Sequence, residues 1–155
     1  MADTIEVESG RFTVGVFQDA AWAQKGLAAL KQAGFPAESL SIFSKDSADA
    51  AALVERTLGA KGERIELPAI GPVIVRGPLL DALQGSARDL GKLGIGGTMR
   101  RVGFQPHDAR IFEVLLGRGG VLVAIRNESR AADALAILHS YGGGNAAIGA
   151  WTGRV

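Results

Sequence analysis

The segment Ile70–Leu80, I-G-P-V-I-V-R-G-P-L-L, contributes most to the expected fold of this chain. Its β-branched run, Val73–Arg76, lies between two Gly-Pro pairs, and a leucine-rich helical pattern follows it. The segment Gly117–Arg126, G-R-G-G-V-L-V-A-I-R, has the same plan of glycines, a β-branched run and then a helical pattern. Short apolar runs bounded by glycine or proline are typical of strands. The two segments therefore organise the chain into β-α units.

The prolines beside the 73–76 run restrict where this strand can lie. Each proline removes a backbone donor, so the strand is expected to be short or to lie at a sheet edge. Pro78 suits the first turn of a helix. Leu83 and Leu90 continue that helix, and Gly85 lowers its helix propensity.

Similar patterns predict the other elements. Three further strands are expected over residues 11–17, 39–44 and 121–126. Further helices are expected to begin at cap residues or a proline: Asp19, Ser47, Pro106 and Ser129. Residues 60–66 are expected to form a charged turn. Four strands with helices packed mainly on one face predict an α+β fold, close to a ferredoxin-like sandwich. A doubly wound parallel sheet is the competing topology.

The length of 155 residues suits one domain with a sizeable core. We divide the chain into an acidic N-terminal arm (residues 1–10), a single α+β domain (11–141) and a glycine-rich C-terminal tail (142–155). Within the domain, residues 91–103 read G-K-L-G-I-G-G-T-M-R-R-V-G. The apolar residues of this segment have helical spacing, and its glycines oppose a stable isolated helix, so we expect it to need close tertiary packing.

The composition excludes several classes of protein. The net charge of +1 gives no strong attraction to nucleic acid or to an anionic membrane, and neither partner is expected. The absence of cysteine excludes a disulfide framework, a thiolate metal site and a cysteine nucleophile. The acidic start M-A-D-T-I-E-V-E-S-G lacks the pattern of a secretory signal, and no run approaches the roughly 18 apolar residues of a membrane span. We therefore expect a cytoplasmic protein.

Three pieces of the sequence occur in an order that resembles a known family. The first is V-G-V-F at Val14–Phe17, followed by a helical pattern and by S-L-S-I-F at Ser39–Phe43. The second is I-G-P-V…G-P-L at Ile70–Leu79. The third is Gly103–Phe104, followed by a helical pattern and by R-G-G-V-L-V-A-I-R at Arg118–Arg126. Together they resemble the general stress protein 17M, or YflT-like, family of small bacterial proteins.

The resemblance covers about residues 12–141. It implies a stress-associated α+β module, and it supplies no catalytic residues to transfer to this chain. The central segment of such proteins is often long, rich in glycine and alanine, and nearly membrane-like. Here it is shorter and carries six charged residues, which argues against membrane association: Asp81, Arg88, Asp89, Lys92, Arg100 and Arg101.

No complete catalytic or nucleotide-binding motif is present. Gly85–Lys92 has five residues between its glycines, where a phosphate-binding loop has four, and Leu93 stands where Ser or Thr would hold magnesium. Ser86 lacks the G-x-S-x-G context of a nucleophile elbow. We therefore assign no catalytic residue and no cofactor.

Metal binding and paired acid–base chemistry also lack a basis in the sequence. The two histidines, His107 and His139, are each explained by a position near a helix end. Asp108 and Glu113 are five residues apart on an expected helix, which does not place them together on one face, so a solvated face is the better interpretation. We therefore assign no metal ligand.

The main electrostatic feature is a set of basic residues, Arg76, Arg88, Lys92, Arg100 and Arg101. Most of this charge is expected to be ordinary surface charge. The set also suits an anion, an acidic protein partner or the acidic arm of a neighbouring subunit.

Our leading hypothesis is a non-enzymatic, stress-associated structural or interaction protein that self-assembles into a homo-oligomer. Sheet edges and exposed apolar residues are natural assembly surfaces, and the candidate interface comprises Val73, Val75, Ile148 and Trp151. The alternative is a regulatory domain that binds a small molecule or an anion between the sheet and residues 91–103, through Arg76, Arg100 and Arg101. An enzyme of unrecognised type is the third hypothesis.

Overall fold

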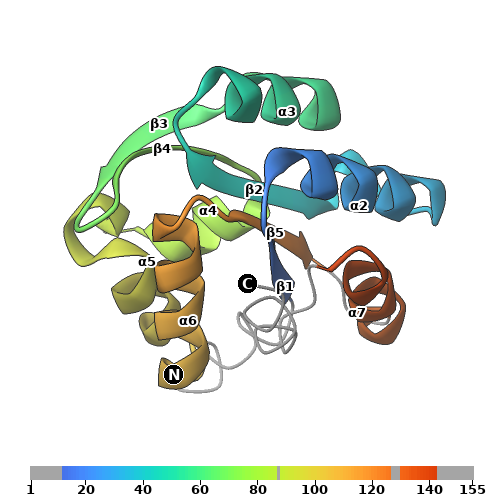
Figure 1. Cartoon of the computed structure of the whole chain (residues 1–155). Coiled ribbons are helices and arrows are strands. Elements are labelled where there is room, and N and C mark those ends of the chain that lie inside the picture. The colour runs from blue at the N-terminus through green and yellow to red at the C-terminus, as the bar shows by residue number, and fades with distance from the viewer. Residues whose placement is uncertain (1–11, 87, 127–129, 143–155) are drawn as a thin grey trace.

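The computed structural model describes residues 12–86, 88–126 and 130–142, and the structural statements below concern these residues. Their strands form one antiparallel sheet in the order β1-β5-β2-β4-β3 (Figure 1). The strands are β1 (Phe12–Phe17), β2 (Leu40–Lys45), β3 (Glu63–Leu67), β4 (Gly71–Arg76) and β5 (Val121–Arg126). The antiparallel pairing excludes the doubly wound parallel sheet.

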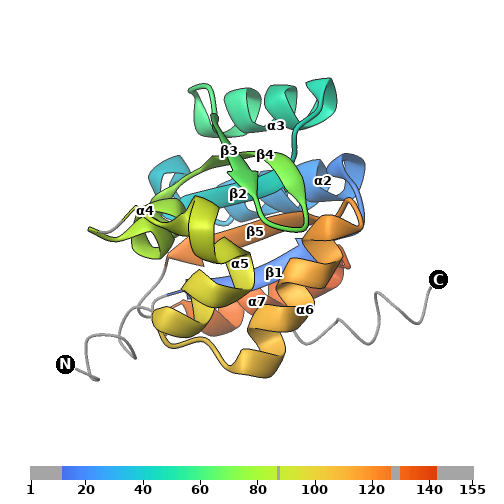
Figure 2. The same ribbon diagram turned by 90° about the vertical axis from the view of Figure 1, so that its left-hand side faces the viewer.

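The helices cover both faces of this sheet (Figure 1 and Figure 2). On one face lie α2 (Ala20–Gln32), α3 (Ala48–Leu58) and α7 (Ala131–Ser140). On the other face lie α4 (Pro78–Gln84), α5 (Leu90–Arg101) and α6 (Pro106–Gly117). A short 3-10 helix, η1 (Ala37–Ser39), leads into β2. The predicted α+β class is therefore confirmed.

The ferredoxin-like sandwich, with four strands and helices mainly on one face, is not confirmed, and β5 shows why both faces are covered. Leu122 and Ala124 enter the core under α4–α6, whereas Val121, Val123 and Ile125 enter the core under α2, α3 and α7. A strand that is apolar at every position suits a sheet that is buried on both faces.

Residues 63–67 form an edge strand and not the expected charged turn. Ile65 and Leu67 lie two residues apart and pack on the α4–α6 core, while Glu63, Arg64 and Glu66 are exposed. Alternation of this kind is typical of a strand with one buried face. Charged residues also protect an edge strand from pairing with another chain.

Because β3 occupies the edge, the prediction that β4 is an edge strand is wrong. β4 pairs with β2 on one side and with β3 on the other. Pro72 has no backbone N–H to donate. It is still compatible with this central strand, because the β2–β4 pairing begins only at Val73. Val73 and Val75 are both 0% exposed, so in this fold they belong to the core and not to a surface that meets a second subunit.

Local signals placed several helix ends correctly. Asp19 and Ser47 each accept a hydrogen bond from the backbone N–H of the third residue onward, as N-caps do. Pro78 begins α4 as expected. The predicted continuation from Leu83 to Leu90 is wrong, because Gly85 takes a positive φ of 57° and ends the helix, and Leu90 begins α5.

The 91–103 segment is mostly helical, as expected, and it bends at Gly94, whose φ of 75° and ψ of 179° are not helical. The glycines of this segment allow α5 to pack closely on α6 and β3. A Cβ atom on Gly96 would lie 2.8 Å from Oε1 of Glu113 in α6. None of the described helices has the length and apolar character that a membrane crossing requires.

Candidate functional site

A pocket of about 600 Å³ opens at the end of the sheet where β2 and β3 begin and β4 ends. Four segments that are distant in the sequence contribute to it: η1 with the start of β2, the end of α3, the start of β3, and the turn from β4 into α4. The predicted pocket between the sheet and residues 91–103 is therefore not the one that this geometry provides.

The pocket has a small apolar part and a charged rim. The apolar part consists of the partly exposed residues Ala37, Leu58 and Pro78, since the other apolar lining residues are almost fully buried in the cores on the two faces of the sheet. The rim residues are more exposed and carry the charged side chains Glu38, Glu63, Arg76 and Asp81.

Gly77 makes the sharp turn that shapes this pocket. Its φ of 121° lies in a region that favours glycine, and it lets the chain leave β4 and enter α4 within one residue. The turn passes close to β2, because a Cβ atom on Gly77 would lie 2.5 Å from the backbone oxygen of Leu40. The buried Ser41 hydroxyl then accepts a hydrogen bond from the backbone N–H of Leu79, at 2.9 Å. This bond ties the start of α4 to the neighbouring strand.

Arg76, the one predicted arginine among the lining residues, also supports the pocket wall. Its Nη1 atom donates a hydrogen bond to the backbone oxygen of Lys61, at 3.1 Å. Lys61 lies in the connection between α3 and β3, on the far side of the opening from α4. One of the N–H donors of Arg76 is therefore already hydrogen-bonded within the protein.

The rim carboxylates have few partners of their own. Glu63 has the Nη2 atom of Arg88 at 4.0 Å, and both side chains are more than half exposed. Within the described part of the chain, neither Glu38 nor Asp81 has a basic side chain within ion-pair distance. These carboxylates are open to solvent and to whatever enters the pocket.

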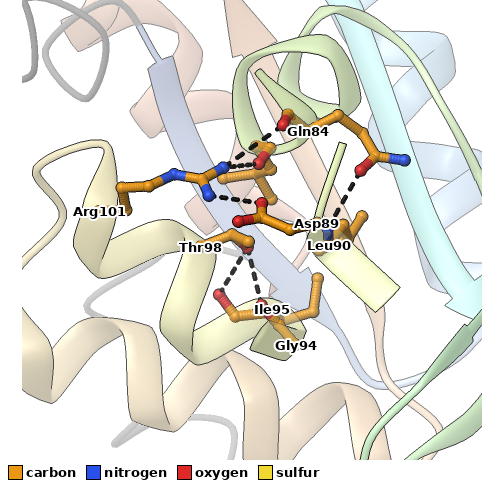
Figure 3. Close-up of polar contacts among 8 residues, drawn as sticks. Gln84, Asp89, Leu90, Gly94, Ile95, Thr98 and Arg101 are labelled. Atoms are coloured by element: carbon orange, nitrogen blue, oxygen red, sulfur yellow. Dashed lines mark hydrogen bonds and ion pairs between the residues drawn. The ribbon is translucent and has the colours of Figure 1, made fainter. Parts of the chain in front are cut away.

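Arg101 has a structural role at a different place (Figure 3). Its guanidinium donates hydrogen bonds to the Asp89 carboxylate and to the backbone oxygens of Leu83 and Gln84. The side-chain oxygen of Gln84 in turn accepts a hydrogen bond from the backbone N–H of Leu90, at 3.1 Å. The network joins the end of α4 to both ends of α5, so Arg101 is committed to holding these helices together.

The hydrogen bond from Arg101, together with its positive charge, holds the pKa of Asp89 below its usual value, although partial burial opposes this shift. Arg100, the next residue, is exposed near the end of α5. Neither Arg100 nor Arg101 lines the pocket that contains Arg76. The three arginines do not form the anion site that the sequence analysis considered.

We expect Arg101→Ala to destabilise the protein in a pH-dependent way. A lowered carboxyl pKa contributes stability above the unfolded-state pKa, and this contribution is lost as the pH falls through the folded-state value. The difference in unfolding free energy between the native protein and the variant should therefore be largest near neutral pH and shrink in acid. Urea denaturation at a series of pH values measures it.

Arg100→Ala is the matched control for this prediction. It removes the same type of side chain from the same helix at an exposed position, so we expect a change of no more than about 0.5 kcal/mol at any pH. An Arg101→Ala effect that stays constant from neutral to acid pH would contradict the role given to Asp89.

Glu113 stabilises the bend in α5 and does not belong to a solvated face. Its Oε2 atom accepts a hydrogen bond from the backbone N–H of Gly96, at 3.2 Å, at the point where the helix resumes after Gly94. The Thr98 hydroxyl donates to the backbone oxygen of Gly94, at 2.8 Å, which adds a side-chain contact at the bend (Figure 3). Glu113 thus acts as a cap from a neighbouring helix.

The described residues contain no group of three acidic or histidine side chains arranged to hold a metal ion. His107 lies in α6 and His139 in α7, which pack on opposite faces of the sheet. The rim carboxylates therefore line the pocket without converging on a single metal position.

The three rim carboxylates were not predicted as site residues from the sequence. The one usable signal was the Gly-Pro pair after Arg76, which marks the turn at the pocket. Of the predicted interface residues, Ile148 and Trp151 lie outside the described part of the chain.

Comparison with family models, with curated proteins and with solved structures found no match to this chain.

Proposed function

We propose that this protein is a non-enzymatic binding domain that holds a small organic molecule in the pocket at the end of the sheet. The observation that supports the proposal is the combination of about 600 Å³ of space, three partly exposed apolar residues and a charged rim. This volume lies within the range of roughly 300–1,000 Å³ that is usual for small-molecule sites. The alternative of an anion site formed by Arg76, Arg100 and Arg101 loses support, because these residues lie apart and Arg101 is committed elsewhere.

Filling the pocket should abolish binding without unfolding the protein. Ala37 lines the pocket from η1 and is partly exposed, so Ala37→Trp places an indole at the opening without disturbing the buried core. A panel of neutral, acidic and basic small compounds is added to the ¹⁵N-labelled protein, and amide chemical shifts are recorded. We expect at least one compound to shift the amides around the pocket in the native protein and to have at least tenfold weaker effects on Ala37→Trp.

Ala28→Trp makes the same change at an exposed position on α2, outside the pocket lining. It is the control and should bind as the native protein does. Circular dichroism checks that both variants keep the native helix content. A panel that shifts no pocket amide, or shifts that survive in Ala37→Trp, would contradict the proposed site.

Self-assembly into a homo-oligomer stays a prediction. Two of its four candidate interface residues, Val73 and Val75, are in the core, so its remaining basis is Ile148 and Trp151. A stress-associated role rests on the sequence resemblance, and a cytoplasmic location rests on the composition. Both stay proposals.

A further inference from the structure

We propose that the ligand of this pocket is an organic cation, a protonated amine or a guanidinium attached to an apolar body. This inference rests on the proposed function and adds the chemical class of the ligand. It is derived from the charges at the rim, from the existing partners of these charges, and from the partly exposed apolar residues of the pocket.

The rim carries more negative than positive charge. Three carboxylates, Glu38, Glu63 and Asp81, and one guanidinium, Arg76, line the opening. Arg76 already donates to the backbone oxygen of Lys61, so its hydrogen-bonding capacity toward a ligand is reduced. With Arg88 beside Glu63 counted as well, the rim has three negative and two positive charges, so it favours a cation over an anion.

The carboxylates are available for such a cation. Glu38 and Asp81 take part in no ion pair with the described residues, and the contact of Glu63 with Arg88 joins side chains that are 52% and 70% exposed. Ion pairs of this exposed kind contribute little to stability, so a ligand can replace Arg88 at low cost.

The partly exposed apolar residues determine the rest of the ligand. Ala37, Leu58 and Pro78 offer a limited apolar surface beside the charged rim. A short apolar chain packs against these residues and keeps its charged head beside the carboxylates, where solvent still reaches it. The head group thus avoids the large cost of burying an unpaired charge.

Three probes with one carbon chain test the inference: hexylamine, hexanol and hexanoate. Each is titrated into the ¹⁵N-labelled full-length protein at low salt, and the amide shifts of Glu38, Glu63 and Gly77 are followed. We expect hexylamine to bind about two- to fivefold more tightly than hexanol, since one exposed charge pair contributes up to about 1 kcal/mol. Hexanoate should bind most weakly, and added salt should weaken hexylamine binding alone.

Matched variants assign the preference to the rim. Glu63→Gln and Asp81→Asn should each weaken hexylamine binding by about two- to fivefold and leave hexanol binding unchanged. Glu66→Gln removes the same charge from an exposed position on the same strand as Glu63, outside the pocket lining, and should have no effect beyond about 1.5-fold.

The outcomes separate the two proposals. Equal binding of the three probes, or tighter binding of hexanoate, would overturn the cationic ligand and leave the binding pocket in place. An effect of Glu66→Gln as large as that of Glu63→Gln would also overturn it, because the preference would then come from general surface charge. If none of the probes shifts the pocket amides, and the wider compound panel shifts none either, the proposed function itself fails.

Discussion

Gly77→Ala should lower the free energy of unfolding by about 2–5 kcal/mol, the largest effect that we expect from a single added methyl group in this protein. Two costs combine. The φ of 121° is strained for any residue with a Cβ atom, and the new Cβ would lie 2.5 Å from both the Leu40 oxygen and the Ser41 Cα atom. These are backbone atoms of a central strand, so they cannot move aside as the end of a flexible side chain can.

Gly71→Ala separates the two costs. Gly71 has a similar φ of 95°, and a Cβ atom there would have no neighbour within 4 Å. We therefore expect this variant to lose only about 1–2 kcal/mol, the cost of backbone strain alone. Urea denaturation of both variants measures the difference. Equal losses would show that the close approach of Gly77 to β2 does not matter for stability.

The second large effect is expected at Gly26, in the middle of α2. Helix propensity alone predicts that Gly26→Ala stabilises the protein by about 1 kcal/mol. We expect the opposite sign, a loss of about 1–3 kcal/mol, because the added Cβ would lie 2.4 Å from Cζ of Phe17. The Phe17 ring is 0% exposed, so the surrounding core prevents it from moving away.

A double-mutant cycle with Phe17→Leu tests this explanation. Leucine removes the end of the ring, so the methyl group added by Gly26→Ala would have room in the double variant. The two single losses together should then exceed the loss of the double variant by at least about 1 kcal/mol. Additive losses, or a Gly26→Ala variant more stable than the native protein, would contradict a steric conflict between these two residues.

Much of the fold was predictable, because strands and helix ends carry local signals. The β-branched runs placed β1, β2, β4 and β5 to within two residues at each end, and Asp19 and Ser47 marked true helix starts. β3 was missed because three of its five residues are charged, and only the spacing of Ile65 and Leu67 indicates a strand. The prediction of helices mainly on one face did not use the uniformly apolar sequence V-L-V-A-I of β5, which is the local signal for a strand buried on both faces.

The candidate site was much less predictable than the fold. Arg76 was predicted to contact an anion, and the structure places it at the pocket, where binding of a ligand stays a prediction. Glu38 and Glu63 lie 25 positions apart in the sequence, and only the antiparallel register of β2, β4 and β3 brings them to the same end of the sheet. Arg101 was misassigned because its partners, the carbonyl groups at the end of α4, leave no pattern in the sequence.

The strand order has a consequence for how the protein forms during synthesis. β5, which begins at Val121, lies between β1 and β2 and is the only described strand that pairs with β1. β1 can therefore pair with β5 only after a segment more than 100 residues further along the chain has been synthesised. Contacts of such long range slow folding. The sheet can close only after residues 121–126 have left the ribosome, so the nascent chain has to be kept from aggregating until β5 emerges.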